Sequence, residues 1–143
     1  MGGRMQIRVS VYAIAVEDDR LLLARLSDSS PIFPPGLWHL LGGGIDPGEQ
    51  PMVALARELR EETGLELGAA RLLDARTYAA QRHGVEWNLT ALFYAVDLKN
   101  GTTVVGEIDG STNAAEWVPL ADLKEAKLSP AAADARRILA RSE

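Results

Sequence analysis

The sequence predicts an α/β domain, and three patterns lead to that prediction. Runs rich in Val, Ile, Leu and Tyr, with partial alternation of apolar and polar residues, indicate strands on both sides of a central helix. That helix, over residues 50–64, has the apolar spacing and the terminal glycine of an amphipathic helix. A second helix is predicted at the C-terminal end, where Ser129 and Pro130 form a helix start.

The composition is that of a globular chain able to bury a core. The chain has 143 residues, of which 47% are hydrophobic and 24% charged, and this length is the usual size of one domain. We therefore expect a single domain over residues 1–143, without linker or internal repeat. The absence of cysteine excludes disulfides, thiolate zinc sites and cysteine nucleophiles, and it suits a cytoplasmic location.

Charge and hydropathy restrict the expected partners. The chain has 15 Lys and Arg against 20 Asp and Glu, a net charge of −5, which argues against binding to nucleic-acid polymers or anionic membranes. No apolar run approaches the roughly 18 residues of a membrane-spanning helix. Acidic residues follow the N-terminal apolar run in place of a cleavage site, so this run indicates a strand rather than a signal peptide.

The N-terminal third is predicted to consist of strands and loops. Residues 6–16 and 20–26 are expected to form a hairpin across the acidic turn between them. Three prolines make residues 27–36 a loop, because proline fits neither a helix interior nor a central strand. Residues 37–41 are a short strand that runs into three glycines.

The first helix is predicted to begin at Gln50 or Pro51 and to end at Gly64, since glycine is the usual residue just past a helix end. Its apolar stripe is expected to consist of Met52, Leu55, Ala56 and Leu59.

Further strands and helices are predicted after the first helix. The strands are expected over residues 70–78, 86–98 and 116–118. A short helix over residues 119–126 precedes a final helix that Ser129 caps and that starts at Pro130. Ile138 and Leu139 are expected to face the core from that final helix.

Three glutamates on the first helix are the candidates for chemistry. Glu58, Glu61 and Glu62 stand at i, i+3 and i+4, so their carboxylates share one helix face beside the apolar stripe. Their repulsion costs the helix roughly 0.2–0.5 kcal/mol per pair. One interpretation is a solvated charged face, the usual meaning of such clusters. The other is a divalent cation, because the preceding glycines expose backbone carbonyls, and carboxylate and carbonyl oxygens are ligands for Mg²⁺ or Mn²⁺.

The stretch around these glutamates resembles the Nudix box. The box pattern is G-x5-E-x7-R-E-U-x-E-E-x-G-U, where U is a bulky aliphatic residue, and this chain matches every fixed position with the correct gaps. The matching residues are Gly43, Glu49, Arg57, Glu58, Leu59, Glu61, Glu62, Gly64 and Leu65. One position near the box departs from the family, which commonly has proline where this chain has Leu41. That change removes no ligand. On the match at every fixed position, the chain is identified as a member of the Nudix hydrolase family.

The resemblance implies a fold, an activity and a cofactor. The fold is a mixed β-sheet sandwiched between α-helices (α/β/α), and the activity is Mg²⁺-dependent hydrolysis of a nucleoside diphosphate linked to another moiety. By position, the resemblance makes Glu58, Glu61 and Glu62 metal ligands, together with the carbonyl of Gly42 or Gly43.

The resemblance also assigns supporting and catalytic roles. Glu49 and Arg57 fall where the family uses a carboxylate and a guanidinium to brace the helix and its ligands, and Arg57 forms an i, i+4 pair with Glu61. Metal ions neutralise the diphosphate and lower the pKa of a bound water. A carboxylate then takes the proton. Family members differ over which carboxylate does so, and the base stays open among the box glutamates and a distal one.

Two glutamates outside the box are candidates for the distal role. Glu116, in "EWVPL", resembles the Glu-Trp pair that supplies an extra metal ligand in MutT-type members, and it is the first candidate for a catalytic or metal-binding residue. The alternative for Glu116 is an edge-strand charge beside a core Trp117. Glu107, in "GEIDG", is the second candidate, with a plain loop charge as the favoured interpretation.

Three side chains near the box are candidates for substrate contacts. Phe33 and Trp38 flank the proline-rich loop, where a nucleobase could stack on them. His39 lies on the strand that enters the box and could touch substrate. The alternatives are core packing, favoured for Trp38, and a structural role for His39. His83 is predicted to be a turn residue.

The substrate class is narrowed by what the sequence lacks. Subfamilies that act on ADP-ribose carry a proline at a set distance after the box, near Ala80 here, whereas the next proline is Pro119. The motifs of NADH and coenzyme A pyrophosphatases are absent as well. A MutT-like (deoxy)nucleoside triphosphate pyrophosphohydrolase of the housecleaning type remains. The alternatives are hydrolysis of nucleotide sugars or dinucleoside polyphosphates, or a non-catalytic nucleotide-binding module. The sequence leaves the oligomeric state open, a homodimer included.

Overall fold

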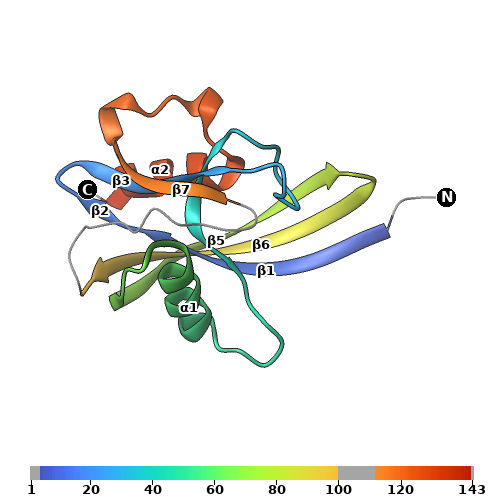
Figure 1. Ribbon diagram of the computed structural model, residues 1–143, viewed down its shortest axis with the longest axis horizontal. Helices are drawn as coiled ribbons and strands as arrows, with labels where there is room; N and C mark the ends of the chain where they lie inside the picture. Colours follow the sequence, from blue (N-terminus) through green and yellow to red (C-terminus); the bar gives the residue numbers. More distant parts are fainter. Residues whose placement is uncertain (1–3, 100–111, 143) are drawn as a thin grey trace.

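The computed structural model describes residues 4–99 and 112–142, and Figure 1 shows their arrangement. The first half comprises β1 (Arg4–Ile14), β2 (Val16–Glu17), β3 (Arg20–Leu26), β4 (Trp38–Gly44) and α1 (Pro51–Thr63). The second half comprises β5 (Leu67–Arg82), β6 (Val85–Leu98), β7 (Thr112–Pro119), two 3₁₀ turns (Leu120–Asp122 and Glu125–Lys127) and α2 (Pro130–Ser142). None of the helices in the described ranges is long and apolar enough to span a membrane.

A mixed sheet lies between the two α-helices, as predicted (Figure 1). The strand order is β2-β3-β4-β1-β6-β5, with β7 paired to β3. The pair β1–β6 is parallel and the other strand pairs are antiparallel. Alternate residues of β1 enter different clusters: Val11 and Ala13 pack with Leu55 of α1, whereas Tyr12 and Ile14 pack with residues of α2. Residues 10–14 of β1 are therefore buried on both faces, whereas Met5, Ile7 and Val9 are exposed.

The N-terminal hairpin differs from the prediction. Only the short strand β2 pairs with β3, across Asp18 and Asp19, whose φ angles of 51° and 60° fit the two-residue turn of a tight hairpin. The strand predicted over residues 6–16 ends at Ile14, and β1 pairs with β4 and β6 instead of β3. The reason is burial of residues 10–14 on both faces, which makes β1 a central strand with a neighbour on each side.

Helix α1 has the predicted ends but a rotated apolar face. It starts at Pro51 and stops before Gly64, whose φ of 76° is the left-handed conformation that glycine favours. Met52, predicted to be in the stripe, is 40% exposed, and Ala56 is only partly buried. The buried residues are Ala54, Leu55, Leu59, Glu62 and Thr63. The helix packs on β4 and β1, and Glu62, which the apolar spacing did not include in the buried face, is buried there.

The C-terminal elements largely agree with the prediction. The Ser129 hydroxyl accepts a hydrogen bond from the Ala132 N–H at 3.1 Å, which makes Ser129 the cap of α2. Ile138 is buried and Leu139 partly buried, as expected. The short helix predicted over residues 119–126 is instead the two 3₁₀ turns.

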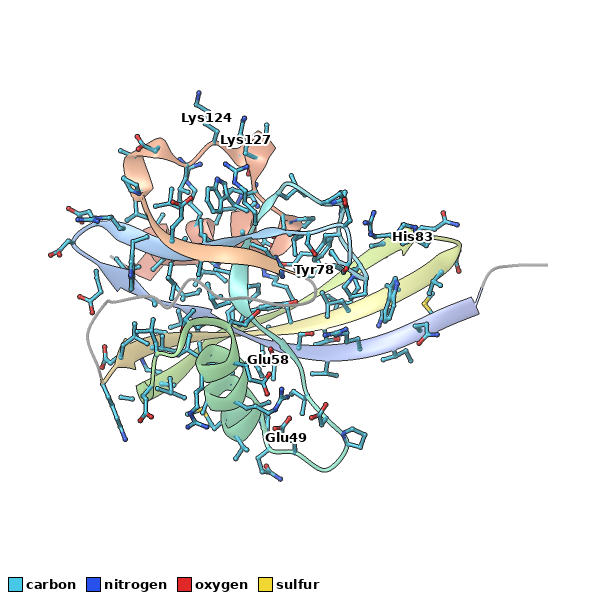
Figure 2. All side chains as sticks on the ribbon, viewed as in Figure 1. Glu49, Glu58, Tyr78, His83, Lys124 and Lys127 are labelled. Atoms are coloured by element: carbon cyan, nitrogen blue, oxygen red, sulfur yellow. The ribbon has the colours of Figure 1, made fainter. Side chains whose placement is uncertain are left out.

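The predicted strands 70–78, 86–98 and 116–118 fall within β5, β6 and β7, which are longer than predicted. His83 occupies the turn between β5 and β6, with a φ of 53° followed by Gly84 at 76°. Figure 2 shows His83 at the tip of this hairpin, well away from Glu58. The turn prediction for His83 is confirmed.

Candidate active site around the glycine-rich end of β4

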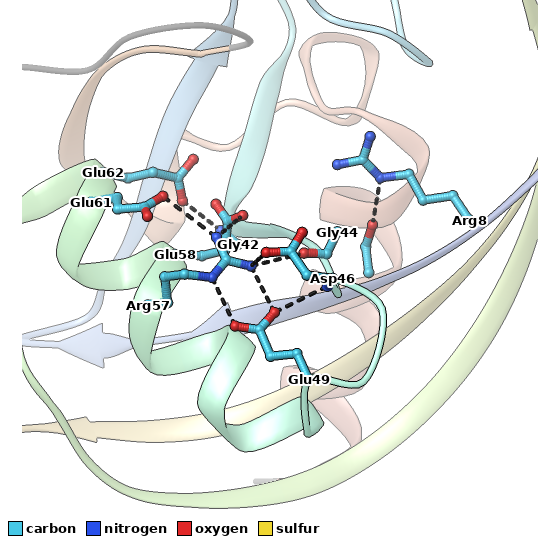
Figure 3. Close-up of polar contacts among 10 residues, drawn as sticks. Arg8, Gly42, Gly44, Asp46, Glu49, Arg57, Glu58, Glu61 and Glu62 are labelled. Carbon is cyan, nitrogen blue, oxygen red and sulfur yellow. Dashed lines mark hydrogen bonds and ion pairs between the residues drawn. The ribbon is translucent and has the colours of Figure 1, made fainter.

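Arg57 of α1 is the centre of a polar network beside the glycines of β4 (Figure 3). Its Nε and Nη2 donate hydrogen bonds to the two carboxylate oxygens of Glu49, at 2.8 and 2.9 Å. Nη2 also donates to the Gly44 carbonyl at 3.2 Å. Glu49 in turn accepts a hydrogen bond from the Asp46 N–H at 3.0 Å. This two-pronged ion pair ties the loop before α1 to the helix, and it lowers the pKa of Glu49 to about 2.

The same guanidinium also contacts two of the three glutamates of the box that lie on α1, Glu58 and Glu61. Its Nη1 donates to Glu58 Oε1 at 3.0 Å and lies 3.5 Å from Glu61 Oε2. The Glu58 side chain is 18% exposed and the Glu61 side chain 60% exposed. Burial raises the pKa of Glu58 above its ordinary value, although the ion pair with Arg57 opposes that shift. Glu58 is therefore a partly buried carboxylate whose burial the ion pair with Arg57 only partly offsets, whereas the Glu61 carboxylate is exposed to solvent.

Glu62 is fixed to the glycine strand. Its Oε1 accepts a hydrogen bond from the Gly42 N–H at 2.8 Å, and the residue is only 9% exposed. Figure 3 shows the three box glutamates along one side of α1, beside Gly42. The pairing of β4 with β1 places these glycines there, because Gly42 lies opposite Tyr12 and Gly43 opposite Val11.

Two glycines of β4 allow this close approach. At Gly42, with a φ of 141°, an added Cβ would lie 2.0 Å from the Val11 carbonyl oxygen, so no side chain fits. At Gly43, an added Cβ would lie 2.8 Å from the carboxylate carbon and Oε1 of Glu58. The missing side chain at Gly43 thus leaves room for the Glu58 carboxylate against the main chain. A carboxylate oxygen and a main-chain carbonyl oxygen are the kinds of donor that a hard divalent cation takes.

The carboxylates do not form a ready-made cage. Among the residues that the structure describes, no group of three carboxylate or imidazole side chains stands close enough to hold an ion. Arg57 and the Gly42 amide instead occupy oxygens of Glu58 and Glu62. Any cation bound here would require these oxygens to change partners, or would draw on carbonyl and substrate oxygens as well.

Two of the predicted substrate residues meet next to the glycines. Phe33 and His39 line a cavity of about 40 Å³ together with Gly42 and Gly43, which is room for water rather than for a nucleobase. His39 is buried, with its Nδ1 2.6 Å from Ser129 Oγ and its ring edge-on to Phe33. Burial, with a smaller contribution from the charge of Arg8, lowers the pKa of His39 to about 4. The imidazole is therefore neutral at physiological pH.

The third predicted substrate residue lies elsewhere. Trp38 packs against the hydrophobic cluster that includes α2, and the Arg25 guanidinium lies over its ring at 4.3 Å from the ring centre. Trp38 is not among the residues that line the small cavity. Its placement agrees with the core-packing alternative.

The distal candidate Glu116 lies on β7, the strand paired with β3. On β7, Ala115 and Trp117 pack into a cluster with Leu59 of α1. Glu116 alternates with them, is exposed, and lies opposite Leu23, whose side chain belongs to the cluster on the α2 side. Its side chain therefore points to the face of β7 opposite Trp117, and its role as a distal metal ligand or base stays a prediction. The second candidate, Glu107, lies outside the described residues.

Sequence reasoning missed Arg8, which lines the small cavity beside His39 and Gly43. Its Nε donates a hydrogen bond to the hydroxyl of the buried Ser10 at 3.2 Å (Figure 3). The alternation of β1 puts Arg8, Ser10 and Tyr12 on one sheet face, and that signal was present in the sequence. It could not point to the box without the knowledge that β1 pairs with β4.

Comparison with known proteins agrees with this geometry. A NUDIX domain family model matches residues 5–141. The nucleoside triphosphatase NudI of Escherichia coli is 43% identical over 63 residues, which is 44% of this chain and 44% of that protein, so less than half of the relative's length is matched.

Solved structures cover more of the chain. The MutT NUDIX hydrolase from Burkholderia pseudomallei is 31% identical, with a TM-score of 0.76 over 94% of this chain and 98% of the other. A MutT protein from Methanosarcina mazei, 24% identical, shares the fold with a TM-score of 0.69 over 96% of both chains.

Proposed function

The chain belongs to the Nudix family, and we propose that it hydrolyses nucleoside triphosphates to nucleoside monophosphates and pyrophosphate with the help of a divalent cation. One observation supports this most strongly. Glu58 and Glu62 are held against the glycines of β4, at a point where the missing side chain of Gly43 makes room for a carboxylate.

The residues fit a hard cation such as Mg²⁺ or Mn²⁺. Glu58, Glu61 and Glu62 would hold it, with the carbonyl of Gly42 or Gly43 as a further oxygen ligand. The donor set is all oxygen, which suits these ions and not zinc or copper. When bound, the cation supplies neutralisation of the anhydride's charge and a lower pKa for a bound water.

The chain's own side chains position the site and accept a proton. Arg57 and Glu49 hold the loop before α1 against the helix, which keeps the carboxylates beside the glycines. In the reaction, a water oxygen attacks one phosphorus of the α–β anhydride, the bridging P–O bond breaks, and nucleoside monophosphate and pyrophosphate are the two products. One of the box carboxylates accepts the proton from the water. We propose a box carboxylate as the base ahead of Glu116, which is exposed on β7 opposite Leu23, and ahead of Glu107, which lies outside the described residues.

The substrate class rests on two arguments. The matched segment of NudI belongs to a protein named as a nucleoside triphosphatase, and the chain lacks the proline that subfamilies acting on ADP-ribose carry near Ala80. We therefore place nucleoside triphosphates ahead of nucleotide sugars and dinucleoside polyphosphates.

A substrate panel tests the proposal. The purified protein is incubated with the deoxynucleoside and nucleoside triphosphates, nucleotide sugars and dinucleoside polyphosphates, each with and without Mg²⁺, and release of pyrophosphate and phosphate is followed. We expect pyrophosphate release from triphosphates that stops when EDTA is added. Turnover confined to sugars or dinucleotides would contradict the substrate class. Metal-independent turnover, or none on the whole panel, would contradict the proposed function.

A further inference from the structure

Arg8, a second arginine near the site, has N–H groups that do not bond to the residues of the Nudix box. Arg8 of β1 is half-buried and lines two pockets. One is the small cavity beside His39. The other has a volume of about 390 Å³, and Glu58 and Trp87 are among the residues that line it. The larger pocket has room for a phosphate chain.

The guanidinium of Arg8 is held in place from one side. Its Nε donates to the Ser10 hydroxyl at 3.2 Å, and Ser10 is fully buried. Gly44 makes room for the planar group, because an added Cβ there would lie 2.9 Å from Arg8 Nη2. Figure 3 shows Arg8 and Arg57 as separate groups, each with its own oxygen partners. The Arg8 group is oriented before any ligand arrives.

The two arginines differ in what their donors contact. All three nitrogens of the Arg57 guanidinium bond to oxygens of Glu49, Gly44 and Glu58. Within the described residues, neither Nη of Arg8 donates a hydrogen bond to the protein. The Nε1 of Trp87, which lines the larger pocket, likewise has no hydrogen-bond partner in the described part of the chain. Unused donors beside a pocket indicate a ligand rich in acceptor oxygens.

We propose that Arg8 binds the phosphate chain of the substrate through its two Nη groups, with Ser10 fixing the direction of the guanidinium. The inference rests on the proposed function, since it assumes a polyphosphate beside the box. Glu58 and Asp46 line the same pocket, so an anionic chain that enters it needs a cation there. A guanidinium suits this task because its paired N–H groups match two oxygens of a phosphate.

The test compares Arg8→Gln with Arg60→Gln, which removes the same charge from the exposed side of α1. In Mg²⁺, Arg8→Gln should raise the KM for nucleoside triphosphate about 10- to 100-fold, the worth of one or two charge-assisted hydrogen bonds, with a much smaller change in kcat. Arg60→Gln should behave as wild type. Arg8→Lys should recover part of the loss, because it keeps the charge but not the fork.

Binding of methylenediphosphonate can be measured without turnover, because its carbon bridge resists hydrolysis. This measurement therefore tests the role of Arg8 separately from the proposed hydrolase activity. Calorimetric titration with Mg²⁺ present should show weaker binding to Arg8→Gln by a similar factor, whether or not the wild type turns over triphosphates. Equal affinities of Arg8→Gln and Arg60→Gln, or no binding to the wild type, would overturn the role of Arg8. If Arg8→Gln has a lower Tm than the wild type, the Arg8→Lys variant decides the question. An Arg8→Lys protein with the affinity and KM of the wild type would contradict binding through the paired N–H groups of Arg8.

Discussion

Arg57 shows how the box uses a single residue for several tasks. Its guanidinium binds Glu49 through two nitrogens and Glu58 through the third, so the loop before α1 and a candidate metal ligand are fixed by one group. Replacing it with lysine would keep one charge but lose the fork. The box pattern requires an arginine and glutamates at these positions. The structure explains their spacing, because it brings Glu49 and Glu58 within hydrogen-bond distance of Arg57.

The ion pair of Glu49 predicts a pH dependence of stability. The folded-state pKa of about 2 is below the ordinary 4.5, so the charged carboxylate stabilises the fold above pH 4.5, and this contribution is lost as the pH falls toward 2. Glu49→Gln should therefore lower the Tm at pH 7, and its difference from wild type should shrink between pH 4.5 and 2. Melting curves across this range test the expectation, with Glu17→Gln, an exposed carboxylate of β2, as the control. A difference independent of pH would contradict it.

At the residue scale, the residues of the Nudix box could be predicted from the sequence, whereas a place for Arg8 beside them could not. The glutamates and Arg57 follow from a fixed pattern within a short stretch, so no knowledge of the fold is needed. Arg8 and Gly44 are distant in the sequence, and only the pairing of β1 with β4 brings them together. Such a contact depends on sheet order, which residue periodicity does not contain.

At the scale of elements, the helix ends were predictable and the helix face was not. Pro51 and Gly64 act through their own backbone preferences, so the predicted limits of α1 are correct. The buried face depends on how the helix lies on β4 and β1. Glu62 is buried there because its carboxylate has a partner, the Gly42 amide, that an apolar-spacing argument ignores.

Helix α2 is linked to the site through Ser129. Its hydroxyl caps the helix at Ala132 and also lies 2.6 Å from His39 Nδ1. Ser129→Ala should lower the free energy of unfolding by about 2 kcal/mol, roughly half from the lost cap and half from a buried imidazole nitrogen left without partner. Urea denaturation measures the change, and Ser29→Ala in the exposed loop is the control. A loss no larger than that of Ser29→Ala would contradict the double role.

At the scale of the whole molecule, the sheet order creates the site. The strand before the box, β4, pairs with β1, and β1 pairs in parallel with β6. This order places the glycines of β4 between α1 and the loop that carries Phe33. The strands themselves were predicted from the sequence, because their residue types and alternation are local. Their order was not, since residues 10–14 of β1 are buried on both faces and the sequence of β1 gives no preference for a neighbour.

The central claim is that the box glutamates carry metal-dependent hydrolysis, and the kcat of Glu62→Gln tests it most directly. The amide oxygen of the substituted side chain can still accept the hydrogen bond from Gly42, so the fold should survive, which an unchanged Tm would verify. At saturating Mg²⁺ and nucleoside triphosphate, we predict that kcat falls by about 100-fold or more. A folded Glu62→Gln protein with the kcat of the wild type would contradict the claim.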